Sequence, residues 1–445
     1  MEDTYEDNFL VEITRMFLNI ALIPQEYTLS MKKIFYINLL FALGLNAQVL
    51  SLQESINKTL SNHPDIKTFA LKVTQSRTGY TSARADYLPQ VNLSAEYDPI
   101  KTYVFPFNGQ FKTVDDDGWN AGVNLKQKIW DFSKTTTKMD AAKVEQKIAE
   151  LSLQDIKALM ASKVKSLYSL MVVQADAIKV REQDLLSKEA YYAQAKALFE
   201  QGLKTEADTS RFLSSVYLAK DNLAIANSSY EKAKNSLSLY MGEKIADDVT
   251  LDASVLKKEF NIDAQNTQKI IASNKELKIY EENIDKNILL HKSAKASHYG
   301  SLDLVASYNR IGSLNEYDSK IVGVVLNIPL YSGGRISAEA QNVQIGTQIS
   351  NEQKASKLLN LKEEISNLLL DIKRYEKTIQ AKKAQLEAAR STQKVLEGRY
   401  KEGLATYIEV LDATALVLSA KLGLLEAYYS RALSIDRIDY LQGKI

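Results

Sequence analysis

Alternation of apolar and polar residues marks two short parts of the chain, residues 88–131 and residues 299–330. In each part, apolar side chains occupy every second position, and polar or small residues fill most of the positions between them. A period of two predicts strands with one apolar and one polar face, and two such runs in each part predict a β-hairpin. Aromatic residues lie near the strand ends, as is typical of transmembrane barrel strands about ten residues long. A soluble sheet with one solvated face has the same pattern, so the strands alone leave both structures open.

Long helical stretches follow each predicted hairpin. In residues 335–401, apolar or small side chains recur at alternating three- and four-residue spacing, interrupted by Lys382 and Gln393. This spacing predicts left-handed coiled-coil packing, and a helix of about 65 residues would be roughly 100 Å long, far too long for a globular core. The predicted seam positions in this helix and in the return helix are Ile365, Leu368, Ile372, Tyr375, Ile379, Leu386, Ala389, Leu396 and Tyr400, then Leu411, Ala415, Leu418, Leu422, Leu425, Tyr429 and Ala432.

An internal repeat relates the two halves of the chain. Residues 199–208 and residues 400–409 both place an aromatic residue before a Gly-Leu-x-Thr step and an acid after it, about 200 residues apart. We expect a first repeat over residues 48–262 and a second over residues 263–445, each with a helix, a β-hairpin and a helical hairpin. The tips of the helical hairpins are predicted near residues 202 and 403.

The first copy is about ten residues longer than the second between its hairpin strands. Because insertions survive best at surface loop tips, we predict a variable loop between residues 98 and 118. The run from Asp115 to Gly118 lies in it and lacks the first and last ligands of a calcium-binding loop, so an acidic hairpin turn is expected instead.

Residues 1–47 are predicted to lie outside the fold. Basic Lys32 and Lys33 precede the apolar run 34–45, which is shorter than the about 20 residues that span a bilayer. Residues 31–47 therefore have the pattern of a secretory signal peptide, with a buried helix as the alternative. Residues 1–30 lack a basic start, and we interpret them as an extension from an early start codon.

Composition and charge narrow the function. The chain has 56 basic and 55 acidic residues, so it lacks the basic excess that nucleic-acid binding requires. It contains 6 Pro and 17 Gly, a usage suited to long helices, and 0 Cys, which excludes disulfides and thiolate metal sites. The three histidines show no metal-ligand spacing, and no catalytic constellation is found, so neither a cofactor, a metal nor enzyme activity is expected.

Four predicted strands per chain are too few to close a transmembrane barrel, which needs about eight. An open sheet edge inside a bilayer would leave backbone groups without hydrogen bonds, at a cost of several kcal/mol each. If the strands are inserted in a membrane, the protein must therefore oligomerise. Two chains would give eight strands and three chains twelve, and the periodicity does not choose between them.

Together, these features resemble the TolC-like outer-membrane efflux protein family over essentially residues 48–442. The most specific match is Tyr400 and Gly403 followed by the segment 409–413, Glu-Val-Leu-Asp-Ala; the predicted strand-to-helix turns at residues 130–133 and 330–335 are also similar. The resemblance implies a mainly α fold with a small β part. Three chains would form a twelve-stranded transmembrane β-barrel continuous with a periplasmic α-barrel of coiled-coil helices.

The resemblance also implies partners and a function. A homotrimer in the outer membrane of a Gram-negative bacterium, in contact with its lipid and with a large periplasmic part, would export drugs and toxic compounds. It would work with a periplasmic adaptor (a membrane fusion protein) and an inner-membrane transporter of the RND or ABC type. A duct for type I protein secretion is the alternative within transport, and a soluble coiled-coil scaffold is the alternative from another class.

Specific residues take roles from the resemblance. It places the adaptor-docking tips at Gly202, Leu203, Gly403 and Leu404. It implies a gate in which Asp208 bonds to Tyr400. Glu409 and Asp412, three residues apart on one helix face, would form carboxylate rings that favour cations in the lumen. The family's gate arginine is replaced by Ala405, and Lys204 stands at the equivalent position of the first copy.

Overall fold

The computed structural model describes residues 49–261 and 267–445. The predicted signal peptide at residues 31–47 and the predicted junction between the repeats near residue 262 lie outside these ranges. The described chain forms one large unit, Leu50–Ile245 with Leu251–Ile445, and a small part of another, Val49 with Ala246–Thr250. The four-stranded sheet and all of the long helices belong to the large unit.

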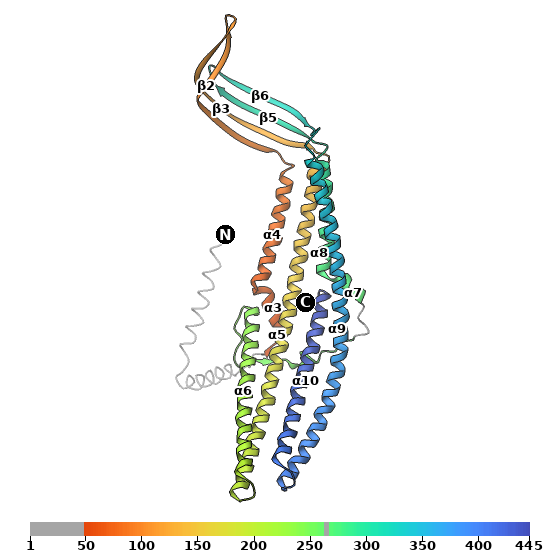
Figure 1. Ribbon diagram of the computed structural model, residues 1–445. Helices are drawn as coiled ribbons and strands as arrows, with labels where there is room; N and C mark the ends of the chain where they lie inside the picture. Colours follow the sequence, from red (N-terminus) through yellow and green to blue (C-terminus); the bar gives the residue numbers. More distant parts are fainter. Residues whose placement is uncertain (1–48, 262–266) are drawn as a thin grey trace, which may run out of the picture. The chain divides into compact units, whose positions relative to one another are not determined.

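The described chain is mostly helical with some strands (Figure 1). Its helices are α3 (Leu52–Asn62), α4 (Pro64–Ala85), α5 (Lys134–Glu200), α6 (Glu206–Met241), α7 (Thr267–Ser273), α8 (Lys275–Ala296), α9 (Arg335–Lys401) and α10 (Tyr407–Leu441), with the 3-10 helix η1 (Ala253–Lys257). Its strands are β1 (Val49–Leu50), β2 (Gln90–Phe107), β3 (Gln110–Trp130), β4 (Thr250–Leu251), β5 (Ser301–Gly312) and β6 (Glu316–Asn327).

Strands β2, β3, β5 and β6 form one antiparallel sheet in that order. The two predicted hairpins therefore lie side by side, joined by the pairing of β3 with β5 (Figure 1). In the described chain, β2 and β6 each pair on one side only, so both edges of the sheet remain open. The four strands that the alternation predicts are confirmed.

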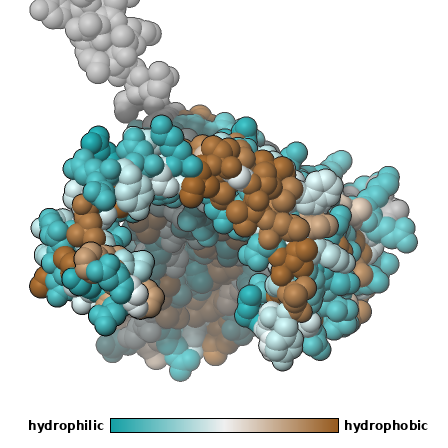
Figure 2. Space-filling model, turned by 90° about the horizontal axis from the view of Figure 1, so that it is seen from above, coloured by the Kyte–Doolittle hydropathy of each residue, from teal (hydrophilic) through white to brown (hydrophobic). Residues whose placement is uncertain are grey.

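The two faces of the sheet differ in polarity, as predicted. Cross-strand neighbours share a face. One row across the sheet consists of Val91, Leu125, Ala306 and Val322, and a neighbouring row on the opposite face consists of Gln90, Lys126, Val305 and Gly323. Apolar residues of the first face are exposed in the single chain, Leu93 by 80% and Val322 by 81%, and the view from above shows apolar side chains gathered in patches (Figure 2).

The hairpin turn predicted within residues 98–118 is confirmed, but the variable loop expected there is wrong. The strands continue through it, and the β2–β3 hairpin turns at Asn108 and Gly109, whose φ angles of 50° and 79° are both left-handed. Asn-Gly in a two-residue turn of this kind is the strongest local hairpin signal, and the sequence interpretation overlooked it. The run from Asp115 to Gly118 lies inside β3 and forms no turn. The extra residues of the first copy therefore lengthen its hairpin.

Two long helices, α5 and α9, connect the sheet side of the unit with the helical hairpins. Each contains 67 residues. Next to the sheet, α4 packs on α5, α5 on α8 and α8 on α9 (Figure 1). Towards the tips of the helical hairpins, α6 packs on α5, α5 on α10 and α10 on α9. None of the helices in the described ranges has the length and apolar character needed to cross a membrane.

The turns from strand to helix adopt the same left-handed backbone conformation in both copies. Phe132 and Ser133 have φ angles of 54° and 66° before α5, and Gly333 and Gly334 have φ angles of 62° and 80° before α9. This conformation is costly for Phe and Ser and nearly free for Gly. The two turns that the sequence predicts here are confirmed.

The predicted seam of α9 is confirmed, while that of α10 is largely wrong. Along α9, six of the predicted positions are buried, and the other three are partly buried. Along α10, the buried stripe runs instead through Val410, Ala413, Val417, Ala420 and Ala427. Because apolar residues cover most of the circumference of α10, two different stripes of side chains could pack against α9. The stripe rich in Ala is the one buried, since small side chains let two helices pack closely. Of the predicted α10 seam, Ala432 is buried, Ala415 is exposed and the five Leu and Tyr positions are partly buried.

The end of α10 enters an apolar core built with α5 and α9. Ile435 and Ile438 of α10 are buried there with Ile365 and Leu361. Asp436 is also buried, and burial raises the pKa of its carboxyl to about 7 although Lys165 and Lys258 oppose the shift.

Candidate gate at the helical hairpin tips

The two helical hairpins turn through the same backbone geometry. Between α5 and α6, Gly202 has a φ angle of 72°, and between α9 and α10, Gly403 has a φ angle of 73°. The amide of the following Leu donates to a carbonyl in the last helical turn, at 2.9 Å in the first tip and 2.8 Å in the second. These contacts form the Schellman arrangement, which closes the end of a helix around a left-handed glycine.

Each return helix begins with a capping box. The Asp208 carboxylate accepts hydrogen bonds from the backbone N–H and the hydroxyl of Thr205, at 3.1 and 3.0 Å. The Glu409 carboxylate accepts the equivalent bonds from Thr406, at 2.7 and 2.8 Å. The Thr406 amide, followed by its hydroxyl, holds the pKa of Glu409 below its usual range. Two of the four predicted gate residues therefore cap helices, and the Thr-x-x-Asp/Glu signal for this was present in the sequence.

Asp412 lies one turn beyond Glu409 on α10. Both carboxylates are exposed in the single chain. The helical geometry brings them to one face, as predicted, but their arrangement in rings requires further copies of the chain.

Tyr400 does not form the predicted hydrogen bond with Asp208 in this chain. Its side chain is 1% exposed, and its hydroxyl has no hydrogen-bond partner among the residues that the structure describes. Burial, followed by the negative charge of Asp208, raises the pKa of the Tyr400 hydroxyl. The bond is absent because the Asp208 carboxylate caps α6 instead.

Phe212 joins the two hairpins. This fully buried residue of α6 lies 6.0 Å, centroid to centroid, from the rings of Tyr191, Tyr400 and Tyr407, one on each of the other three helices. Two of these contacts are edge-to-face, the arrangement that aromatic pairs favour. The sequence interpretation missed Phe212, because a single aromatic residue on a helix carries no sign of its partners.

Cations cover the same cluster from outside. The Lys204 ammonium lies 5.1 Å from the centroid of the Tyr400 ring, and the Arg211 guanidinium lies 5.2 Å from that of Tyr407. Lys204 stands in the first copy at the position equivalent to Ala405, which replaces the family's gate arginine. Its ammonium thus contacts the ring of Tyr400 by a cation–π interaction.

A polar contact ties α5 to α9 next to this cluster. The Tyr191 hydroxyl donates to the Glu397 carboxylate, and Gln393 donates to the same oxygen at 2.8 Å. Burial, followed by the bond to Glu397, raises the pKa of Tyr191 to about 12. Gln393, which interrupts the apolar seam of α9, therefore helps to hold the Glu397 carboxylate that binds Tyr191.

Beyond the aromatic cluster, the tips expose apolar side chains. Leu203 is 66% exposed and Leu404 is 68% exposed. Because each follows a left-handed glycine, the backbone turn holds both side chains away from the helices. The structure thus places two equivalent leucines on the outer surface of the tips.

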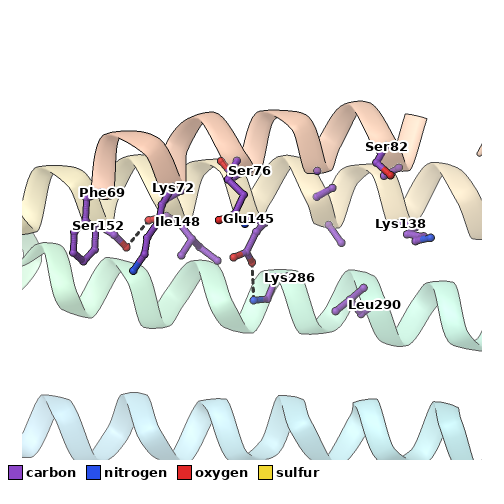
Figure 3. Close-up of a pocket in the computed structure, with 16 residues that line it drawn as sticks. Phe69, Lys72, Ser76, Ser82, Lys138, Glu145, Ile148, Ser152, Lys286 and Leu290 are labelled. Atoms are coloured by element: carbon purple, nitrogen blue, oxygen red, sulfur yellow. Dashed lines mark hydrogen bonds and ion pairs between the residues drawn. The ribbon is translucent and has the colours of Figure 1, made fainter. Parts of the chain in front are cut away.

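A groove of about 640 Å³ lies between α4, α5 and α8, away from the tips (Figure 3). Its floor consists of small and apolar residues of α5 such as Ala141 and Ile148. Two of its charged side chains, Lys286 and Glu145, pair with each other at 2.8 Å. In the described ranges, no group of three or more His, Asp or Glu side chains is placed to hold a metal ion.

The model of the outer membrane efflux protein family matches residues 55–243 and 266–444. The chain belongs to this family. Outer membrane protein TolC of Vibrio cholerae is 22% identical over 426 residues, which cover 91% of this chain and 94% of the relative. The cation efflux system protein CusC of Escherichia coli is 21% identical and is covered to 82%, with 84% of this chain aligned.

Solved structures of this family share the fold. A structure of CusC superposes with a TM-score of 0.79 at 19% identity and covers 91% of this chain and 96% of its own. The outer membrane protein VceC of Vibrio cholerae superposes with a TM-score of 0.76 at 17% identity, over 88% and 96% of the two chains. The resemblance read from Tyr400, Gly403 and the segment 409–413 is thus confirmed at the level of the family.

Proposed function

We propose that this protein is the outer-membrane duct of a tripartite pump that exports drugs and other toxic small molecules. The observation that carries the proposal is the four-stranded sheet, with both edges open and one apolar face. In a bilayer, backbone groups at open edges must find partners, so the sheet of one chain requires sheets of other copies. Three copies would supply twelve strands, within the range of transmembrane barrels.

In this proposal, two repeats, residues 48–262 and 263–445, build each subunit of a homotrimer. The strands lie in the outer membrane in contact with its lipid, and the long helices form a periplasmic α-barrel. A periplasmic adaptor, or membrane fusion protein, docks at Gly202, Leu203, Gly403 and Leu404. The exposure of the two leucines supports this role, because a docking surface needs apolar anchors that solvent reaches in the unbound state. An inner-membrane transporter of the RND or ABC type supplies the energy.

The proposed gate combines Asp208, Tyr400, Glu409 and Asp412. In a trimer, Glu409 and Asp412 would form two stacked carboxylate rings that favour cations over anions. Tyr400 would hold the closed state by its packing against Phe212 and Lys204, which replaces the missing arginine contact. The capping boxes of Asp208 and Glu409 would keep the return helices rigid up to the constriction.

Deletion of the gene tests the export function. We expect the mutant cells to become more susceptible to dyes, detergents and antibiotics, and complementation to restore resistance. Loss of one secreted protein at unchanged susceptibility would instead support the duct for type I protein secretion.

Purification from the outer membrane tests the assembly. We expect a detergent-solubilised particle with the mass of three chains that conducts ions in planar bilayers. A monomeric protein in the soluble fraction would contradict the proposal and support the scaffold alternative.

A further inference from the structure

The groove between α4, α5 and α8 is elongated and lies within one chain. Its lining residues on α5 extend from Lys138 to Ser152, which corresponds to roughly 20 Å at about 1.5 Å per residue. Figure 3 shows Phe69 and Lys72 near one end of the groove and Lys138 near the other. Its volume of about 640 Å³ lies in the range of sites that bind small molecules.

The lining of the groove is mainly apolar, and small residues keep it open. On α5 these are Ala141, Ala142 and Ala149, and on α4 they are Gly79 and Ala83. Glycine is less stable than alanine inside a helix, and a Cβ at Gly79 would meet nothing within 4 Å. Packing within the chain therefore gives no reason for glycine at this position. Its effect is to leave the α4 wall of the groove bare, which suits a hydrocarbon chain lying along it.

The charges of the lining leave one cation without a counter-charge. The lining contains three lysines and one carboxylate, that of Glu145. Lys286 pairs with Glu145 at 2.8 Å, and Lys138 pairs with Asp86 at 2.8 Å. In the part of the chain that the structure describes, Lys72 forms no ion pair, and its ammonium lies over an aromatic ring at the end of the groove. Charge complementarity therefore favours an anionic group at this end.

The position of Lys72 favours a free molecule over a lipid of the bilayer. Lys72 lies roughly 20 Å along α4 from Ala85, the residue at the sheet end of this helix. In the proposed function the sheet lies in the outer membrane, so a phospholipid with its phosphate at Lys72 would have to leave the bilayer. A single-chain anion meets no such obstacle. This choice of ligand thus rests on the proposed function, whereas the groove itself does not depend on the number of copies.

We propose that the groove binds a single-chain fatty acid, with its carboxylate at Lys72 and its hydrocarbon chain along Gly79 towards Lys138. The ion pair of Lys286 with Glu145 has no net charge, so the chain can pass beside it. This assigns to the protein a ligand site that is separate from the gate and lies next to the sheet.

Photochemical labelling tests the site. The full-length protein in nanodiscs of phosphatidylcholine is illuminated with hexadecanoic acid that carries a diazirine, and the labelled peptides are identified by mass spectrometry. We expect labels within residues 138–152. Unlabelled hexadecanoate should compete at up to about fivefold lower concentration than hexadecyltrimethylammonium, because an exposed ion pair contributes up to about 1 kcal/mol, which corresponds to this factor.

Two variants and a control connect the label to the groove. Gly79→Leu places a side chain in the groove and should remove most of the labelling, while folding is retained because leucine is preferred to glycine in a helix. Thr81→Leu adds the same side chain at an exposed position on the opposite side of α4 and should leave the labelling unchanged. Lys72→Gln should make the two competitors equally potent.

Three results would overturn the inference: unchanged labelling of Gly79→Leu, labels confined to the strands, or equal potency of the two competitors on the wild type. Equal labelling of residues 138–152 by a phosphatidylcholine that carries the same diazirine would identify a membrane lipid as the ligand and would also overturn it. None of these results changes the mass of the purified particle, so the proposed trimer stands or fails separately.

Discussion

Tyr400 has a buried hydroxyl with no partner among the described residues, and this changes what its substitution should do. In the proposed gate, the closed state rests on the ring of Tyr400, which contacts Phe212 and Lys204, and an unpaired buried hydroxyl contributes no stabilisation. We expect Tyr400→Phe to leave the leak conductance in planar bilayers unchanged. Tyr400→Ala should raise it, because removal of a buried aromatic ring costs about 3–5 kcal/mol.

Equal leak conductance of the two variants would contradict this account. It would indicate that the hydroxyl bonds to a residue of another subunit, and that the gate depends on that bond. Tyr217→Ala is a suitable control, because Tyr217 lies on α6 and is exposed.

At the scale of the residue, the sequence predicts the positions of the hairpin tips better than the contacts that their residues make. The repeated segment identifies the two tip glycines, Gly202 and Gly403, and the acids Asp208 and Glu409. A motif that occurs twice in one chain can be found without knowing which residues it contacts. The contacts of Phe212, Tyr191 and Glu397 come from three different helices, and no spacing along the chain encodes them.

At the scale of the element, the tip glycines are required for their backbone conformation. A Cβ at Gly403 would meet nothing within 4 Å, so the cost of Gly403→Ala comes from its φ angle of 73° alone. We expect the substitution to destabilise the tip by about 1 kcal/mol, which corresponds to roughly fivefold faster hydrogen exchange of the Leu404 amide.

Gly398→Ala is the matched control for this prediction. Gly398 lies inside α9 with equally open surroundings, and alanine is preferred to glycine by about 1 kcal/mol in a helix. Exchange at the tip should stay the same or become slower. Faster exchange in both variants would show that bulk near the tip, and not the backbone angle, is responsible.

The end of α10 should make the stability of the protein depend on pH. The folded state raises the pKa of Asp436 to about 7 from an ordinary value of 3.8, so it favours the protonated carboxyl. The stability from this group is present below about pH 4 and is lost as the pH rises to about 7. We expect Asp436→Asn to unfold at a higher temperature than the wild type at pH 8 and at the same temperature at pH 4.

Thermal unfolding of both proteins from pH 4 to pH 8 measures this difference. A constant gap in midpoint temperature across the range would show that Asp436 titrates normally. In that case, the charges of Lys165 and Lys258 would offset the effect of burial on the pKa of Asp436.

The elements themselves are predicted well wherever one periodicity dominates. The alternating strands and the α9 seam contain a single apolar stripe, so the apolar face of each strand and the buried face of α9 follow directly from the sequence. The apolar positions of α10 cover most of its circumference, and the choice among stripes depends on how closely Ala420 lets α9 approach. The register slip between the repeats places the first hairpin turn only within residues 98–118, because such a slip looks the same whether it lengthens a loop or a hairpin. The Asn-Gly pair at Asn108 and Gly109 is the local signal that locates the turn.

At the scale of the whole molecule, two adjacent residues of β6 test the proposed barrel. One would face lipid and the other would face the lumen. Val322 and Gly323 point to opposite faces of β6, and a Cβ at Gly323 would meet nothing within 4 Å. Lysine on the lipid side near the middle of a bilayer costs about 2–4 kcal/mol. We expect Val322→Lys to reduce the amount of trimer in the outer membrane.

Gly323→Lys should assemble normally and shift ion selectivity towards anions, because its charge would line the lumen. Assembly is measured by the yield of trimer from outer membranes, and selectivity by reversal potentials in a salt gradient. Normal assembly of Val322→Lys would argue against a lipid-facing surface at this position.

The architecture of the whole molecule is predicted only in part by the residues. Two hairpins, long helices and two tips follow from periodicity and repetition, and the open edges show that one chain cannot complete the sheet. The number of copies depends on the curvature of the sheet. This curvature results from many weak contacts, so no single sequence motif predicts it. The division into repeats at residue 262 stays a prediction.

The continuity of α9 has a mechanical consequence. This helix runs unbroken for 67 residues, from the strand-to-helix turn at Gly334 to the hairpin tip, where Tyr400 of the proposed gate lies. With no proline inside it, it acts as a stiff lever, so a displacement at one end becomes a tilt of the whole rod. Over roughly 100 Å, a tilt of about 5° at the sheet moves the tip by about 9 Å. Small angular changes beside the membrane would therefore suffice to set the aperture at the far end.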